Sequence, residues 1–75
     1  MENFTERERE VLFLLLRGLN NKEISKTLFI SNHTTKAHVA SIYKKLGVSN
    51  RVQAAIKCMK LGAEEIFDLN DILDE

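Results

Sequence analysis

Residues 21–46 decide the fold, and they read NKEISKTLFISNHTTKAHVASIYKKL. Asn21 is predicted to cap a short helix and Ser31 a longer one, because either side chain can accept a hydrogen bond from a first-turn backbone N–H. The longer segment has apolar residues at helical intervals of three and four: Val39, Ile42, Tyr43 and Leu46. It should end at Gly47, which readily adopts a left-handed conformation. A short helix, a tight turn near 29–30 and a longer helix form a helix-turn-helix.

Two further helices are predicted, one on each side of this motif. Thr5 and Glu8 have the spacing of a capping box, so a helix begins there and stops at Gly18. Ser49 is predicted to cap a last helix that ends at Gly62. The chain contains no proline, and the connections between these segments are short. The sequence therefore predicts an all-α fold, a four-helix domain built around a helix-turn-helix.

The formal net charge of zero conceals a strong asymmetry. Residues 1–62 hold eleven Lys and Arg against five Asp and Glu, a formal charge of +6. Residues 63–75 hold six acids and no base, a formal charge of −6. A basic body beside an acidic tail is typical of proteins that bind nucleic acid. A basic surface that is only solvated fits the same charges equally well.

Residues 63–75 are predicted to form an acidic tail that follows a domain spanning residues 1–62. In a helical projection Ile66, Leu69 and Ile72 cluster on one side, with the acids opposite, so the pattern permits a short fifth helix. A frayed, solubilising tail is the alternative, because a dozen residues form only a marginal helix in isolation.

Composition argues against several classes of protein. The longest apolar run, Val11–Leu16, is far shorter than a membrane span, and the N-terminus lacks the pattern of a signal peptide. Cys58 is the single cysteine and cannot form an internal disulfide, so a cytoplasmic protein is expected. With His33 and His38 it supplies too few ligands for structural zinc, and no metal site is predicted. No nucleophile with an oriented base and no phosphate-binding glycine loop is present, so we expect no enzyme, cofactor or small-molecule ligand.

The helix that begins near Ser31 carries the predicted functional residues on its outward face. That face holds no acid and consists of Asn32, His33, Lys36, Ala37, Ala40, Ser41 and Lys44. Small polar residues let the helix N-terminus approach a duplex, where its free N–H groups favour a phosphate. Lys36 can donate to guanine O6 and N7. A thymine methyl can be contacted by the methyl group of Thr35, Ala37 or Ala40. The pattern predicts that this helix enters the major groove of DNA.

Several motifs with fixed spacing carry a resemblance to a known family. They are FTEREREVL at 4–12, GLNNKEI at 18–24, IS at 30–31 with Thr34, KAH at 36–38, and KLGVSNR at 45–51 with Ala54. Over about residues 4–62 the chain resembles the LuxR/FixJ-type (GerE-like) DNA-binding domain of bacterial transcription regulators. The resemblance implies a domain that pairs through its fourth helix and binds inverted half-sites, on the nucleoid in the cytoplasm. The chain is then a short regulator or the output end of a longer one, such as a response regulator.

The resemblance also assigns DNA-contacting positions. Base reading falls on Lys36, Ala37 and Ala40. Contacts to the DNA backbone fall on Asn21, Ser31, Thr34, Thr35, Lys44, Ser49 and Arg51. The predicted DNA-binding set also includes Asn32, Ser41 and His38. For His38 the expected role is a phosphate contact or helix packing. Thr35 stands where the family usually has valine, so its hydroxyl must find a partner or turn outward. Ala40 stands where the family often has a basic or polar residue.

The fourth helix shows two apolar faces in projection. One holds Ala55, Ile56 and Met59, and the other holds Ala54, Cys58 and Leu61. One face should meet the core, and the second is a candidate partner surface, unless the small domain wraps the helix on both sides. The predicted dimerisation residues are Ala54, Cys58, Met59 and Leu61.

The function predicted from these observations is sequence-specific binding of double-stranded DNA by a homodimer that regulates transcription. Two copies are expected because one domain offers few base contacts, each worth about 1–3 kcal/mol. A protein-interaction module is the alternative. In that hypothesis the helix-turn-helix is a scaffold for a partner such as RNA polymerase, and the acidic tail is the active part.

Overall fold

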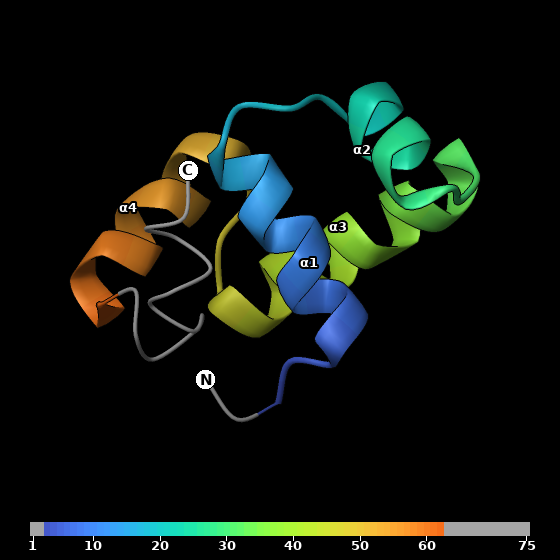
Figure 1. The fold of residues 1–75 in the computed structure, drawn as a ribbon. Coiled ribbons are helices and arrows are strands. Elements are labelled where there is room, and N and C mark those ends of the chain that lie inside the picture. Colours follow the sequence, from blue (N-terminus) through green and yellow to red (C-terminus); the bar gives the residue numbers. More distant parts are fainter. Residues whose placement is uncertain (1–2, 63–75) are drawn as a thin grey trace.

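The computed structural model describes residues 3–62, and these form four helices. The helices are α1 (Glu6–Leu16), α2 (Asn21–Leu28), α3 (Asn32–Leu46) and α4 (Arg51–Leu61). The predicted all-α fold and its helix-turn-helix, formed by α2 and α3, are confirmed for this part of the chain (Figure 1). The predicted fifth helix, in residues 63–75, lies outside the described residues.

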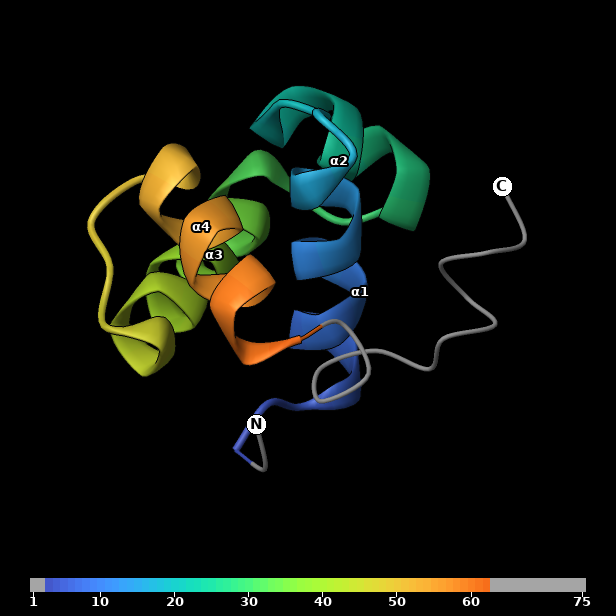
Figure 2. The same cartoon turned by 90° about the vertical axis from the view of Figure 1, so that its left-hand side faces the viewer.

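Helix α3 is the central element of the fold. It packs against α1, α2 and α4, and α1 also contacts the other two helices. Figure 1 shows α4 and α2 on opposite sides of α1, and Figure 2 shows the same fold turned by 90°. The buried apolar residues come from all four helices and the segment before α1: Phe4, Val11, Leu12, Leu15, Ile24, Val39, Ile42, Leu46, Ala54 and Cys58.

The helix starts follow from side-chain caps, and two of them differ from the prediction by one residue. Thr5 caps α1 in the predicted capping box with Glu8. Asn20, not Asn21, caps α2, because its Oδ1 accepts the Glu23 N–H at 2.8 Å while the Glu23 carboxylate accepts the Asn20 N–H. At α4 the cap is Asn50 rather than the predicted Ser49.

Asn50 caps α4 by accepting the Gln53 N–H at 2.9 Å. The neighbouring Ser49 instead donates its own N–H to the Gln53 side-chain oxygen at 2.7 Å. Both misplaced caps stand next to a second residue that can cap, so composition alone does not separate them. The Ser31 cap of α3 is confirmed.

The turn between α2 and α3 contains an unusual backbone conformation. Phe29 ends α2 with φ +57°, in the left-handed region that disfavours a residue with a Cβ. Its side chain is 93% exposed, so no packing explains the choice of an aromatic residue there. Gly47 ends α3 in the same region, at φ +73°, as predicted. No helix in the described part of the chain has the length and hydrophobicity needed to span a membrane.

Candidate nucleic-acid interface

The N-terminus of α3 is organised by Ser31. Its Oγ accepts the Thr34 N–H at 3.0 Å and donates to the Thr34 hydroxyl at 2.9 Å. The first turn of α3 contains no acid, and the basic residues Lys44 and Lys45 lie in its last turn. The positive end of the helix dipole therefore faces outward beside small polar side chains, an arrangement that attracts a phosphate oxygen.

One face of α3 is exposed along most of its length. Asn32, His33, Lys36, Ala37, Ala40 and Lys44 are all exposed. Thr34 and His38 are half-buried at its edges. Within residues 3–62, neither Lys36 nor Lys44 has an ion pair or a side-chain hydrogen bond, so both ammonium groups are available to an anion or a base edge. This face is acid-free, as predicted.

Thr35 does not belong to this face, and its prediction as a DNA contact is wrong. Its side chain is fully buried, and its Oγ1 lies 2.6 Å from the Oγ of Ser25 on α2. Ser25 donates its single hydroxyl proton to the Asn21 carbonyl at 2.8 Å, so Thr35 must donate to Ser25. The hydroxyl that replaces the family's usual valine has therefore found a partner inside the helix-turn-helix.

Ser41 was also predicted on the outward face, but its hydroxyl points toward α1. Its Oγ donates to Oε2 of Glu8 at 2.6 Å. One turn later on the same side of α3, Lys45 Nζ lies 2.6 Å from Oε1 of Glu8. The prediction of Ser41 as a DNA contact is therefore corrected to a contact between helices.

Glu8 has contacts with α3 that the sequence did not predict, besides its predicted place in the capping box. It is only 5% exposed and accepts hydrogen bonds from the Thr5 N–H, Ser41 and Lys45. Burial raises its pKa, but the hydrogen bonds from Lys45, Ser41 and the Thr5 N–H, together with the positive charge of Lys45, outweigh burial and lower the pKa to about 2. The spacing of Ser41 and Lys45 by four residues was the available signal, because it places both on one side of α3.

Arg51, predicted to grip the DNA backbone, makes contacts within the protein. Its guanidinium donates to the Leu15 carbonyl at 2.9 Å and to the Leu19 carbonyl at 2.6 Å. These carbonyls lie at and after the end of α1, where helix acceptors lack intrahelical partners. Arg51 therefore fixes the start of α4 against α1. Its side chain is only half-buried, so a contact with the DNA backbone stays a prediction. Asn21 is half-buried in the first turn of α2, and Ser49 is exposed between α3 and α4.

Helix α4 directs one apolar face inward and one outward. Ala54 and Cys58 are buried in the core, so their prediction as dimerisation residues is wrong. Burial also raises the pKa of the Cys58 thiol. The exposed face consists of Val52, Ile56 and Met59, which are 67%, 48% and 81% exposed and are called the α4 stripe below. Met59 alone of the predicted set lies on this stripe, and Leu61 is half-buried.

The fold and the acid-free face define a helix-turn-helix domain, and comparison with known proteins identifies its family. The model of the luxR family of bacterial regulatory proteins matches residues 2–58. The chain therefore belongs to the LuxR family.

Curated relatives support this membership. The transcriptional regulatory protein LnrK of Bacillus subtilis (strain 168) is 52% identical over 60 residues, covering 80% of this chain and 27% of LnrK. The spore germination protein GerE of the same strain is 42% identical over 62 residues, covering 83% of this chain and 84% of GerE. The chain thus spans about a quarter of the length of LnrK and most of the length of GerE.

Two solved structures share the fold. The response regulator ChrA of a heme-sensing two-component system superposes with a TM-score of 0.75 at 39% identity, over 81% of this chain and 30% of ChrA. The transcription factor GerE superposes with a TM-score of 0.70 at 44% identity, over 79% of this chain and 88% of GerE. The chain is therefore a DNA-binding domain of a family of transcription regulators, and not of a family of enzymes.

Proposed function

We propose that the chain binds double-stranded DNA sequence-specifically, with the N-terminal half of α3 in the major groove. The exposed face of α3 carries this proposal, because it has no acid and presents Lys36 without a partner in the described part of the chain. Lys36 is the main base reader, and Ala37 and Ala40 offer methyl groups to thymine. The backbone is gripped by the α3 N-terminus and by Lys44.

The remaining predicted contacts fit this pose to different degrees. Asn32 and Ser31 are exposed beside the α3 N-terminus, and Thr34 and His38 are half-buried at the edge of the face. We assign Ser31, Asn32 and Thr34 to phosphate contacts, because they lie around the positive end of the α3 dipole. His38 lies in the middle of α3 at the edge of the exposed face, and we assign it to a phosphate beside the major groove. Asn21 and Ser49 lie on neighbouring elements and are assigned to the flanking phosphates.

Self-association through α4 is the second part of the proposal. The α4 stripe exposes three large apolar side chains spaced by four and three residues, which suits packing against an identical helix. Two domains related by a two-fold axis would meet inverted half-sites about one helical turn of DNA apart. Such a dimer would act in the bacterial cytoplasm, on the nucleoid.

Selection of bound duplexes from a random pool, repeated at several salt concentrations, tests the proposal. We expect enrichment of a site with two inverted half-sites whose centres lie about 10–10.5 base pairs apart. Enrichment of a single unpaired half-site would contradict the dimer and leave base reading in place. Recovery of sequences no different from the starting pool would contradict sequence-specific binding altogether.

A second candidate function, docking to another protein such as RNA polymerase, is favoured by Phe29. This aromatic side chain is 93% exposed in the turn of the helix-turn-helix. Exposed aromatic residues are enriched at protein interfaces. We expect Phe29→Ala to leave DNA affinity unchanged while lowering transcription by RNA polymerase in a purified system. Absence of any affinity for short random duplexes at low salt would make this the leading function.

A further inference from the structure

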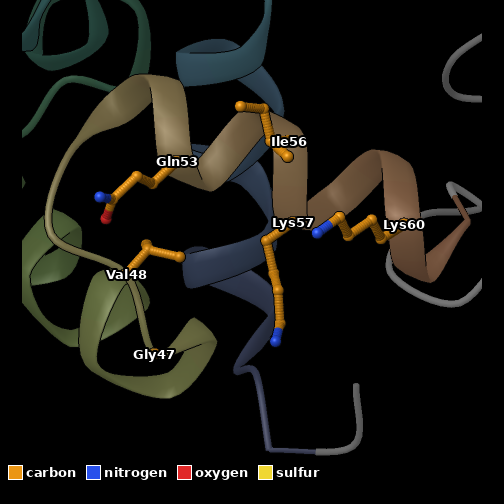
Figure 3. A pocket seen from close by; sticks show the side chains of 6 residues that line it. All are labelled: Gly47, Val48, Gln53, Ile56, Lys57 and Lys60. Carbon is orange, nitrogen blue, oxygen red and sulfur yellow. The ribbon is translucent and has the colours of Figure 1, made fainter.

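A shallow groove lies between α4 and the segment that joins it to α3. Its volume is about 320 Å³, and it is lined by Gly47, Val48, Gln53, Ile56, Lys57 and Lys60 (Figure 3). Gly47 and Val48 come from the end of α3 and the following loop, and the other four residues come from α4. The groove lies at the opposite end of α3 from the DNA-facing N-terminus, and none of its lining residues belongs to the proposed DNA-contact set.

The groove has an apolar floor and a basic rim. Ile56 is 48% exposed and Val48 is half-buried, and both offer apolar surface. Lys57 and Lys60 are exposed, and within residues 3–62 neither has an ion pair or a side-chain hydrogen bond. A matching occupant therefore needs large apolar side chains interleaved with carboxylates.

The chain itself contains a segment with this composition. Residues 63–75 read AEEIFDLNDILDE, with six acids, five large apolar residues and no base. The segment begins immediately after Gly62, whose backbone (φ +88°, ψ +136°) directs the chain out of α4. Lys60 lies only two residues earlier, so the tether is short and gives the segment a millimolar effective concentration at the groove.

We propose that residues 63–75 bind this groove within the same chain. Apolar side chains of the segment cover Val48 and Ile56, and its carboxylates pair with Lys57 and Lys60. Each exposed ion pair contributes little by itself, but the open groove also buries little apolar surface, so docking needs the ion pairs as well as the apolar contacts. Binding at this site also keeps the acids away from Lys36 in the N-terminal half of α3, where they would repel DNA.

The docked segment competes with self-association, an inference that rests on the proposed dimer. Ile56 belongs both to the groove and to the α4 stripe. A segment that covers Ile56 therefore hides part of the surface that a second copy would need. Removing the charge of the segment should free this surface and strengthen the dimer.

The docking is tested by backbone amide chemical shifts of the full chain. In one variant the six acids of residues 63–75 are replaced by Asn or Gln, which keeps the length of the chain. We expect this variant to shift the amides of Val48, Gln53, Lys57 and Lys60, at every protein concentration. In a Lys57→Glu/Lys60→Glu background, neutralising the six acids should cause no further amide shifts at the groove. In a Lys36→Glu/Lys44→Glu background, it should cause the same shifts as in the wild type.

Three results would overturn the docking. Shifts confined to the N-terminal half of α3 would place the acids on the DNA-facing surface. Shifts that grow with protein concentration would place the segment on another copy. An absence of shifts would leave the groove unoccupied.

Sedimentation tests the competition separately. We expect the neutralised variant to dimerise at a severalfold lower concentration than the wild type. If the neutralised variant dimerises at the same concentration as the wild type but still shows amide shifts at the groove, the segment docks there without competing with dimerisation. If neither protein dimerises, the proposed dimer fails, and the chemical shifts still decide the docking.

Discussion

Glu8 joins the first helix to the DNA-facing helix through one buried carboxylate. Its oxygens accept hydrogen bonds from Ser41 and Lys45 on α3 and from the backbone at the start of α1. The sequence predicted only the last of these, because a capping box is a local signal. The other two partners lie 33 and 37 residues away, and their approach depends on how α1 packs on α3.

Glu8→Gln should lower stability in a pH-dependent way. The folded-state pKa of about 2 lies below the ordinary value of 4.5, so the charged group stabilises the fold above about pH 5 and progressively less as the pH falls toward 2. The shift corresponds to about 3 kcal/mol of unfolding free energy. We expect wild type and variant to differ by this amount at pH 7 and to converge near pH 2, measured by urea unfolding.

Glu10→Gln is the matched control for this experiment. Glu10 pairs with Arg7 at 3.6 Å on the exposed side of α1, and exposed pairs contribute about 0–1 kcal/mol. A difference between wild type and Glu8→Gln that stays constant from pH 7 to pH 2 would show that the carboxylate charge is not what stabilises the contact.

The hydroxyls of Ser25 and Thr35 make an asymmetric pair whose direction can be tested. Ser25→Ala leaves the buried Thr35 hydroxyl without its acceptor and should cost about 1–3 kcal/mol of unfolding free energy. Thr35→Val should cost less, because Ser25 still donates to the Asn21 carbonyl. The double variant should recover most of the loss caused by Ser25→Ala. Chemical denaturation of all four proteins measures the cycle, and additive losses would contradict the coupling.

At the scale of whole elements, local signals predicted where the helices lie but not which faces they bury. The Thr5 and Ser31 caps and the Gly47 stop were correct because each depends on neighbouring residues. The two apolar faces of α4 looked equivalent, and the structure buries the one with Ala54 and Cys58. Periodicity cannot decide which face of α4 is buried, because that depends on the surface that α1 and α3 present to it.

This assignment of faces predicts two different outcomes for substitutions in α4. Met59→Glu should abolish self-association with little effect on unfolding, because Met59 is 81% exposed. Cys58→Ser should lower stability and leave self-association of the folded protein intact, because it places a hydroxyl in the core. Thr27→Glu, on the exposed part of α2, is the control for added charge. Sedimentation and thermal unfolding separate the two effects, and an unchanged dimer in Met59→Glu would place the interface elsewhere.

For the whole molecule, the sequence predicted which residues of α3 are exposed because exposure on this helix follows a simple pattern. Lys36, Ala37, Ala40 and Lys44 are exposed as predicted. The predicted contacts that failed, Thr35 and Ser41, have hydroxyls that bind other parts of the fold. Their side chains suit either use, so only the three-dimensional arrangement distinguishes a DNA contact from an internal one.

The surviving face is sparse, with one long donor among small side chains. Its affinity for DNA should therefore come mainly from phosphate contacts and be strongly salt-dependent. The opposite charges of residues 1–62 and 63–75 make the formal net charge of zero a poor guide to this behaviour.

The central claim is that α3 reads bases through Lys36 and holds the backbone through Lys44. It is tested most directly by measuring the affinity of Lys36→Ala and Lys44→Ala for a selected site and for random duplex across a salt series. We predict that Lys36→Ala loses about 1–3 kcal/mol on the selected site and much less on random DNA. Lys44→Ala should weaken both alike and reduce the salt slope by about one. Equal losses of Lys36→Ala on the two duplexes would contradict the account.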